Sequence, residues 1–269
     1  MFEGDNKKLK QVISYMQAHW PSDVKPEWQV QLEDYPAILE QIIKDFTKDK
    51  TKKRNLIRIA GLSGSGKTSQ ILPAVEKYCE NTRLNPVLVA ARRFVEYHPF
   101  RKEIENEYGS ENLRKKTDEF STIMMVLMLN VLTKQGYDIV LDVTLLAPEI
   151  EDILLGMLKA GNYKTMLLMI ATSPKVTEHF LGGRGWRHSK ATEEEFIRAT
   201  SAALDFYAKN AGSLHLILWS VYDLDPIYNG PIKDGLDIFK EYSSKTALPP
   251  SNDDERREAK IQFLSKLCQ

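Results

Sequence analysis

Short apolar runs alternate with helical repeats through the middle of the chain. Apolar stretches with the length of buried strands occur at 55–60, 86–91, 138–144, 164–172 and 213–220. Helices are predicted between them, over 68–80, 113–135, 148–160 and 192–209, the last with a capping box of Thr192 and Glu195. Because strands separated by helices form right-handed βαβ units, the pattern predicts an α/β fold: a three-layer sandwich around a mostly parallel sheet.

Both ends of the chain have helical character instead. Apolar residues at helical spacing predict helices over 6–20 and 32–46, and a charged amphipathic helix over 252–267 follows a Pro-Pro break. We therefore expect an N-terminal helical extension over 1–50, a core over 51–225 with a lid at 173–190, and a C-terminal helical tail over 226–269.

The composition and charge of the chain argue against nucleic-acid and membrane partners. With a formal net charge of zero, the chain lacks the basic excess typical of nucleic-acid-binding proteins. The two cysteines, Cys79 and Cys268, show no metal-ligand spacing and indicate free thiols. We find no signal-like N-terminus and no run near the roughly 18 apolar residues that span a membrane. We expect a cytoplasmic protein with no nucleic-acid or membrane partner, and export without a cleavable signal stays open.

A phosphate-binding pattern follows the first predicted strand. Residues 61–68 fit G-x-x-x-x-G-K-[ST], whose backbone N–H groups and following helix form an anion site. Lys67 is expected to reach the β- and γ-phosphates, and the Thr68 hydroxyl to bind Mg²⁺. This predicts the fold of P-loop NTPases with ATP and Mg²⁺ as cofactors, although the choice between ATP and GTP stays open. The residues expected to line the nucleotide site are Gly61, Ser63, Gly64, Ser65, Gly66, Lys67, Thr68 and Ser69.

Further features favour a small-molecule kinase over a GTPase or a mechanical ATPase. No [N/T]-K-x-D motif for guanine follows in a suitable place, and the later strand ends in a single acid, Asp142, rather than a pair. Asp142 is expected to hold the water shell of Mg²⁺ or to contact the substrate hydroxyl. Arg184, Arg187 and Lys190 follow glycines in the predicted lid, where cations stabilise a transferring phosphoryl group. For each of these cations, a solvated basic loop is the alternative.

Four segments in order resemble the zeta toxin family of P-loop kinases. They are the P-loop with its strand, the segment from Val87 to His98-Pro99, the strand from Gln135 to Thr144, and Ile170 to Lys175 before the lid. The resemblance implies a kinase that uses ATP to phosphorylate a small-molecule hydroxyl, UDP-N-acetylglucosamine in family members. It also implies a small antitoxin as partner.

The chain departs from the family at the position of the catalytic base. The resemblance places an Asp there, whereas this chain has Arg92, and a guanidinium does not accept a proton at neutral pH. Asp142 matches the acid of the family's Glu-Gly-Thr motif and is the first candidate to replace the base, with Glu96 second. Arg92, Glu96, Thr144 and Lys190 are the candidate substrate-binding residues, Lys190 standing where the family has a lid arginine. Arg92 and Arg93 are expected to grip an anionic substrate or an acidic protein surface.

Three functions remain open at this point. The first is the ATP- and Mg²⁺-dependent kinase, with Lys67, Asp142, Arg184 and Arg187 as its catalytic residues. The second is a nucleotide-binding pseudokinase or effector that lacks the family's base and acts by binding a partner protein. The third is a P-loop switch that binds a partner through its helical ends.

Overall fold

A computed structural model describes most of the chain. The described residues are 13–14, 24–31, 33–62, 64–143, 148–173, 175–177, 190–212, 214–245, 247–248 and 252–267. Among them, no helix combines the length and the apolar character needed to cross a membrane. Cys79 is a buried free thiol, as expected, and Cys268 lies outside the described residues.

Six strands form one sheet in the order β2-β3-β1-β4-β5-β6. The first five in this order are parallel, and β6 runs antiparallel to β5. The strands are β1 (Asn55–Gly61), β2 (Val87–Val89), β3 (Ile139–Asp142), β4 (Lys164–Ala171), β5 (His215–Ser220) and β6 (Tyr228–Pro231). The mostly parallel sheet confirms the predicted α/β class.

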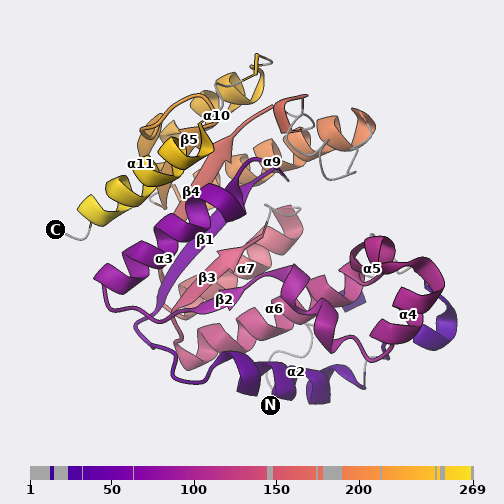
Figure 1. The fold of residues 1–269 in the computed structure, drawn as a ribbon. Helices are drawn as coiled ribbons and strands as arrows, with labels where there is room; N and C mark the ends of the chain where they lie inside the picture. The colour runs from indigo at the N-terminus through magenta and orange to yellow at the C-terminus, as the bar shows by residue number, and fades with distance from the viewer. Residues whose placement is uncertain are drawn as a thin grey trace.

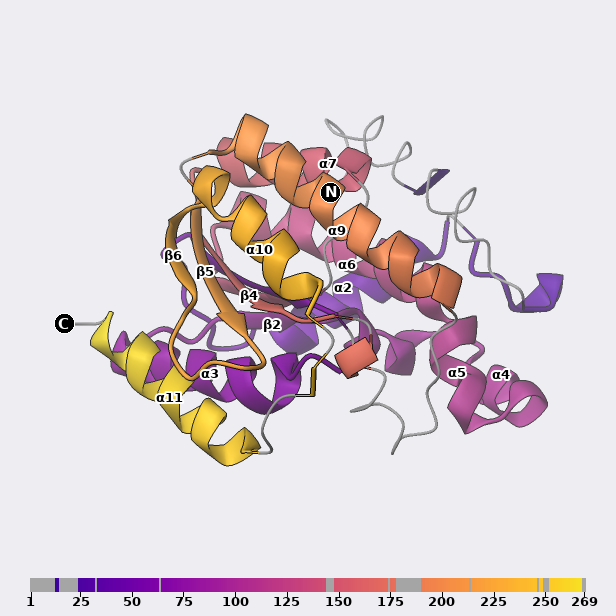
Figure 2. The ribbon, with the colours of Figure 1, turned by 90° about the horizontal axis from the view of Figure 1, so that it is seen from above.

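Helices cover both faces of the sheet (Figures 1 and 2). One face carries α3 (Leu72–Asn81) and α11 (Asp253–Lys266), and the other carries α6, α7, α9 and α10, with α2 packed outside α6. The remaining helices are α2 (Tyr35–Phe46), α4 (Arg101–Tyr108), α5 (Ser110–Lys116), α6 (Asp118–Gln135), α7 (Pro148–Ala160), α9 (Lys190–Asn210) and α10 (Leu236–Ser243). Short helical turns are η1 (Pro26–Trp28), η2 (Lys67–Ile71), η3 (Ala91–Arg93), η4 (Val95–Tyr97) and η5 (Ile232–Asp234).

Strand alternation explains the three layers. On β1, Ile57 and Ile59 pack into the core under α3 and α11, whereas Leu56 joins the core with α6 and Ala60 joins the core with α7 and α9. Successive side chains of a strand point to opposite faces, so an almost wholly apolar strand requires cover on both sides.

One charged residue interrupts this apolar strand. Arg58 is buried and forms a two-pronged ion pair with Glu151 of α7, with Nη2 2.7 Å from Oε1. The Tyr207 hydroxyl on α9 accepts from Arg58 Nη1 at 2.9 Å and donates to Glu151 Oε2 at 2.7 Å. The cluster ties the central strand to two helices, because its charged groups depend on one another's hydrogen bonds at this depth.

Several element boundaries differ from the sequence prediction. The strand predicted over 86–91 ends at Val89, where the chain turns into η3, and the helix predicted over 113–135 is two helices that change direction at Thr117. α5 is highly charged and buries only Leu113, whereas α6 is buried around most of its circumference, so the break at Thr117 separates a mostly exposed helix from a core helix. Helix α9 begins at Lys190, ahead of the predicted cap at Thr192. The sequence analysis did not predict α4, α10 or β6.

Candidate functional site

The phosphate-binding pattern folds as a turn between β1 and α3. Gly61, Gly64 and Gly66 have φ angles of +137°, +82° and +96°, a region that glycine adopts without strain. A Cβ on Gly61 would also lie 3.0 Å from Ser65 Oγ and 3.2 Å from the Ile170 carbonyl oxygen. The glycine spacing is therefore required by the backbone itself. Ser63 lies outside the described residues.

Lys67 is the first residue of η2, and its side chain points back toward the loop. Its Nζ donates to the carbonyl oxygens of Gly61 at 2.7 Å and Leu62 at 2.8 Å. Burial lowers the pKa of Lys67 to about 8; the charge of Asp142 opposes this shift, and the charges of Arg92 and Arg114 add to it. Thr68 and Ser69, the next two residues, are at least partly exposed. Lys67 thus lies close enough to three charged side chains from other elements to interact with them.

Asp142 and Arg92 form an ion pair beside this loop. Asp142 ends β3, level with Ile59 on the neighbouring strand, and its carboxylate is almost fully buried. Nη1 of Arg92, in the turn after β2, lies 2.8 Å from Asp142 Oδ2, in an ion pair without the alignment of a hydrogen bond. Because the carboxyl ends of parallel strands meet at one edge of the sheet, β1 and β3 bring the loop and Asp142 together. Asp142, the first candidate for the base, is therefore ion-paired with Arg92.

One charged residue that acts on Lys67, Arg114, was not expected from the sequence, and it interacts in turn with Asp118. The charge of Arg114 on α5 lowers the pKa of Lys67. Desolvation by the surrounding protein raises the pKa of Asp118, the first residue of α6, and the charge of Arg114 opposes this rise. Both side chains are solvent-accessible. Arg114 lies on α5, shortly before the break between α5 and α6, and no motif in the sequence marks this break.

Other predicted residues have different positions. Glu96, the second candidate for the base, is 64% exposed and has an oxygen 3.4 Å from Arg101 Nε, on the side of α4. Arg93 donates to the Leu88 carbonyl oxygen at 3.0 Å and stacks its guanidinium 4.2 Å from the centre of the Phe46 ring. The structure thus gives these two residues contacts of their own, apart from the Arg92–Asp142 pair.

The predicted lid is largely beyond the part of the chain that the structure describes. Thr144, Arg184 and Arg187 lie outside the described residues, and Lys190 is placed only as the first residue of α9. Among the residues that the structure describes, no three His, Cys, Asp or Glu side chains gather as a metal site would require. Thr68 and Asp142, the two residues expected at the Mg²⁺ site, lie on η2 and at the end of β3.

Comparison with known proteins settles the family. The model of the zeta toxin family matches residues 39–213, well over half of the chain. The chain belongs to the zeta toxin family. The resemblance seen in the sequence is thereby confirmed, and the family match ends before α10 and α11.

Two known proteins are similar to this chain, one in sequence and one in fold. Toxin PezT of Streptococcus pneumoniae serotype 4 is 25% identical over 146 residues, which are 54% of this chain and 56% of that protein. The chain thus spans about half the length of the curated relative it matches. A solved structure from the PezAT chromosomal toxin–antitoxin system of the same organism matches with a TM-score of 0.64 and 19% identity, covering 89% of this chain and 96% of that chain. Fold and family together identify a P-loop protein of kinase-like architecture.

Proposed function

We propose that this protein is an ATP- and Mg²⁺-dependent kinase that transfers the γ-phosphoryl group to a hydroxyl of a small molecule. The single observation that carries the proposal is the P-loop, with Lys67 drawn into it and the charges of Asp142, Arg92 and Arg114 close by. A phosphoryl-transfer site needs this combination, because charge spreads over the oxygens of the transferring group and the nucleophile must also lose a proton.

In this proposal, the loop and the charged groups have separate roles. The backbone N–H groups of 64–68 bind the β- and γ-phosphates, and Lys67 supplies a cation to them. Thr68 offers an oxygen ligand of the kind that Mg²⁺ prefers, and Asp142 would contact the ion only through its water shell. The ion would neutralise charge on the phosphates. Arg184 and Arg187 of the lid would stabilise the transferring group from the other side.

The acceptor would bind across from the nucleotide. Arg92 and Lys190 would bind an anionic part of it, which a nucleotide sugar supplies, and Thr144 would hydrogen-bond to it. When Arg92 turns from Asp142 to that anion, the Asp142 carboxylate is free to take the proton of the hydroxyl as its oxygen bonds to the γ-phosphorus and ADP leaves.

Labelled ATP tests this function directly. The purified protein is incubated with γ-labelled ATP, Mg²⁺ and UDP-N-acetylglucosamine or other hydroxyl acceptors, and the labelled product is measured. We expect transfer by the wild-type protein and none by Lys67→Ala. Equal transfer by both would refute the proposal, and Asp142→Asn tests the base.

The Arg92–Asp142 pair also favours a second candidate, a nucleotide-binding pseudokinase. Here Arg92 neutralises the acid permanently, and the protein acts by binding a partner, such as a small antitoxin-like protein. Tight binding of ATP without transfer to any acceptor, together with gain of transfer in Arg92→Asp, would support this candidate over the first.

A further inference from the structure

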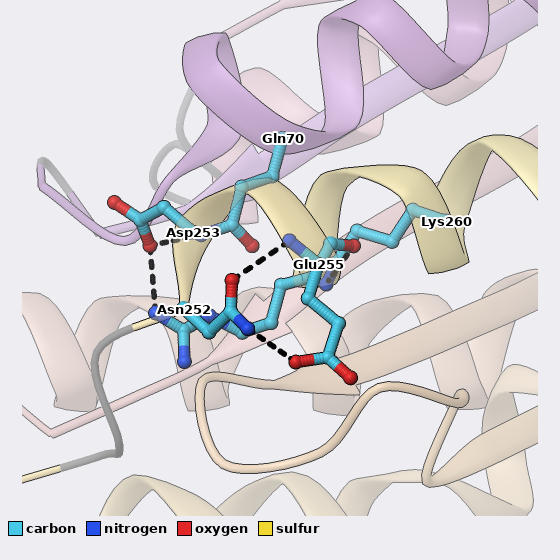
Figure 3. Close-up of polar contacts among 6 residues, drawn as sticks. Gln70, Asn252, Asp253, Glu255 and Lys260 are labelled. Carbon is cyan, nitrogen blue, oxygen red and sulfur yellow. Dashed lines mark hydrogen bonds and ion pairs between the residues drawn. The ribbon is translucent and has the colours of Figure 1, made fainter.

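Helix α11 lies outside the segment that the family model matches, yet it reaches the P-loop. It packs along α3 and against η2, the first turn after the loop (Figures 1 and 2). At its start, Asp253 Oδ1 accepts a hydrogen bond of 3.1 Å from Gln70 Nε2 (Figure 3). This contact joins residues 183 positions apart in the sequence.

Gln70 in turn lies against the last glycine of the loop. Its side chain is 4% exposed, and a Cβ placed on Gly66 would be 3.0 Å from both Cδ and Nε2 of Gln70. The Gln70 backbone N–H also donates to the Gly66 carbonyl oxygen at 2.8 Å. A movement of the Gln70 amide would therefore shift the backbone of Gly66.

At the start of α11, a helix cap and an ion pair position Asp253, whose side chain is 60% exposed. The Asn252 side chain caps the helix by accepting from the Glu255 N–H at 3.1 Å, and Asp253 pairs with the buried Arg256 at 2.6 Å. Lys260, one turn further along and fully buried, donates to the Arg256 carbonyl oxygen at 3.4 Å (Figure 3). The Asn252 cap stabilises this helix terminus against fraying.

We propose that α11 braces the phosphate-binding loop, and that Asp253 is a positioning residue that acts on Gly66 through Gln70. The inference rests on the proposed nucleotide binding, because its consequence is that the C-terminal helix sets the affinity for ATP. Anion-binding N–H groups act only when their directions converge, so a small shift of Gly66 weakens the site without any contact to the nucleotide.

The test exchanges donor and acceptor across the contact. In Gln70→Glu, two carboxylates face each other, and we expect the dissociation constant of a non-hydrolysable ATP analogue with Mg²⁺ to rise about tenfold in calorimetry. In the double variant Gln70→Glu with Asp253→Asn, the new amide at position 253 becomes the donor, and the new carboxylate at position 70 can pair with Arg256. Affinity should then return to within about threefold of wild type. The double variant keeps the added negative charge at position 70. If that charge weakened binding by repelling the nucleotide, affinity would stay low in the double variant, whereas a positioning role predicts that it recovers.

A matched control uses the far end of the same interface. Asn81 Nδ2 of α3 donates to Ser265 Oγ of α11 at 3.2 Å, and Ser265→Ala should leave nucleotide affinity unchanged within about twofold. If the single Gln70→Glu variant does not fold, amide hydrogen exchange is measured in Asp253→Ala instead. We expect faster exchange than in wild type at residues 64–67 and unchanged exchange at residues 77–81.

The outcomes separate the two proposals. Wild-type protein that binds no nucleotide overturns the proposed function and the brace with it. Wild-type protein that binds, with a double variant as weak as the single one or with unchanged exchange in Asp253→Ala, overturns the brace alone.

Discussion

The buried Lys260 of α11 gives a prediction whose size follows from its surroundings. The side chain is fully buried, its hydrogen bond to the Arg256 carbonyl oxygen is 3.4 Å long, and the ammonium lies 5.7 Å from the centre of the Trp219 ring. Burial lowers the pKa of Lys260 from 10.5 to about 8; the nearby Arg256 adds to the shift, and Asp253 opposes it. A folded-state pKa below the unfolded value means that the fold carries a cost while the lysine is charged.

We expect replacement of this lysine by methionine to stabilise the protein at neutral pH. A pKa difference of about 2.5 units corresponds to about 3 kcal/mol at pH 7, and the cost disappears as pH rises from about 8 to 10.5, because the lysine then becomes neutral in both states. Lys260→Met removes the ammonium group and leaves an unbranched apolar side chain of similar shape. The gain in free energy of unfolding should be about 2–3 kcal/mol at pH 7 and below about 1 kcal/mol at pH 10.5.

Urea unfolding at both pH values measures this difference. Lys266 lies exposed near the end of the same helix, and Lys266→Met should change the free energy of unfolding by less than about 0.5 kcal/mol. A Lys260→Met variant that is less stable than wild type at pH 7, or whose advantage does not shrink at high pH, would show that the buried ammonium is stabilised by its contacts.

Three further substitutions probe the core and the site. Glu151→Ala leaves Arg58 without its carboxylate and should cost about 3–5 kcal/mol in urea unfolding; a loss below about 1 kcal/mol would contradict the role given to the pair. Gly66→Ala puts a side chain at φ +96° and 3.0 Å from Gln70, so we expect about 1–2 kcal/mol lower stability and loss of ATP binding in calorimetry, whereas normal binding would show that the loop adapts. If the proposed kinase accepts a nucleotide sugar, Arg92→Ala should raise KM for that acceptor at least about tenfold while KM for ATP changes little; equal effects on both would argue against an acceptor contact.

Local patterns in the sequence predicted the layers and the loop. Apolar runs indicated the five parallel strands, because a strand buried on both faces is apolar at nearly every position. Apolar residues at helical spacing indicated most of the helices. The P-loop was readable for a similar reason, since its glycines, Lys67 and Thr68 are all contributed by one short segment.

The partners of the site were decided by tertiary structure. Two features of the site depend on where η3 and the α5–α6 junction turn. Arg92 lies 2.8 Å from Asp142, and Arg114 acts on the pKa of Lys67. The contact of Gln70 with a helix 183 residues later depends on the packing of α11 on α3. These contacts join elements that are far apart in the sequence and come together only when the chain folds. A single sequence shows the spacing of residues within each element, so it gives no periodic signal for contacts between elements.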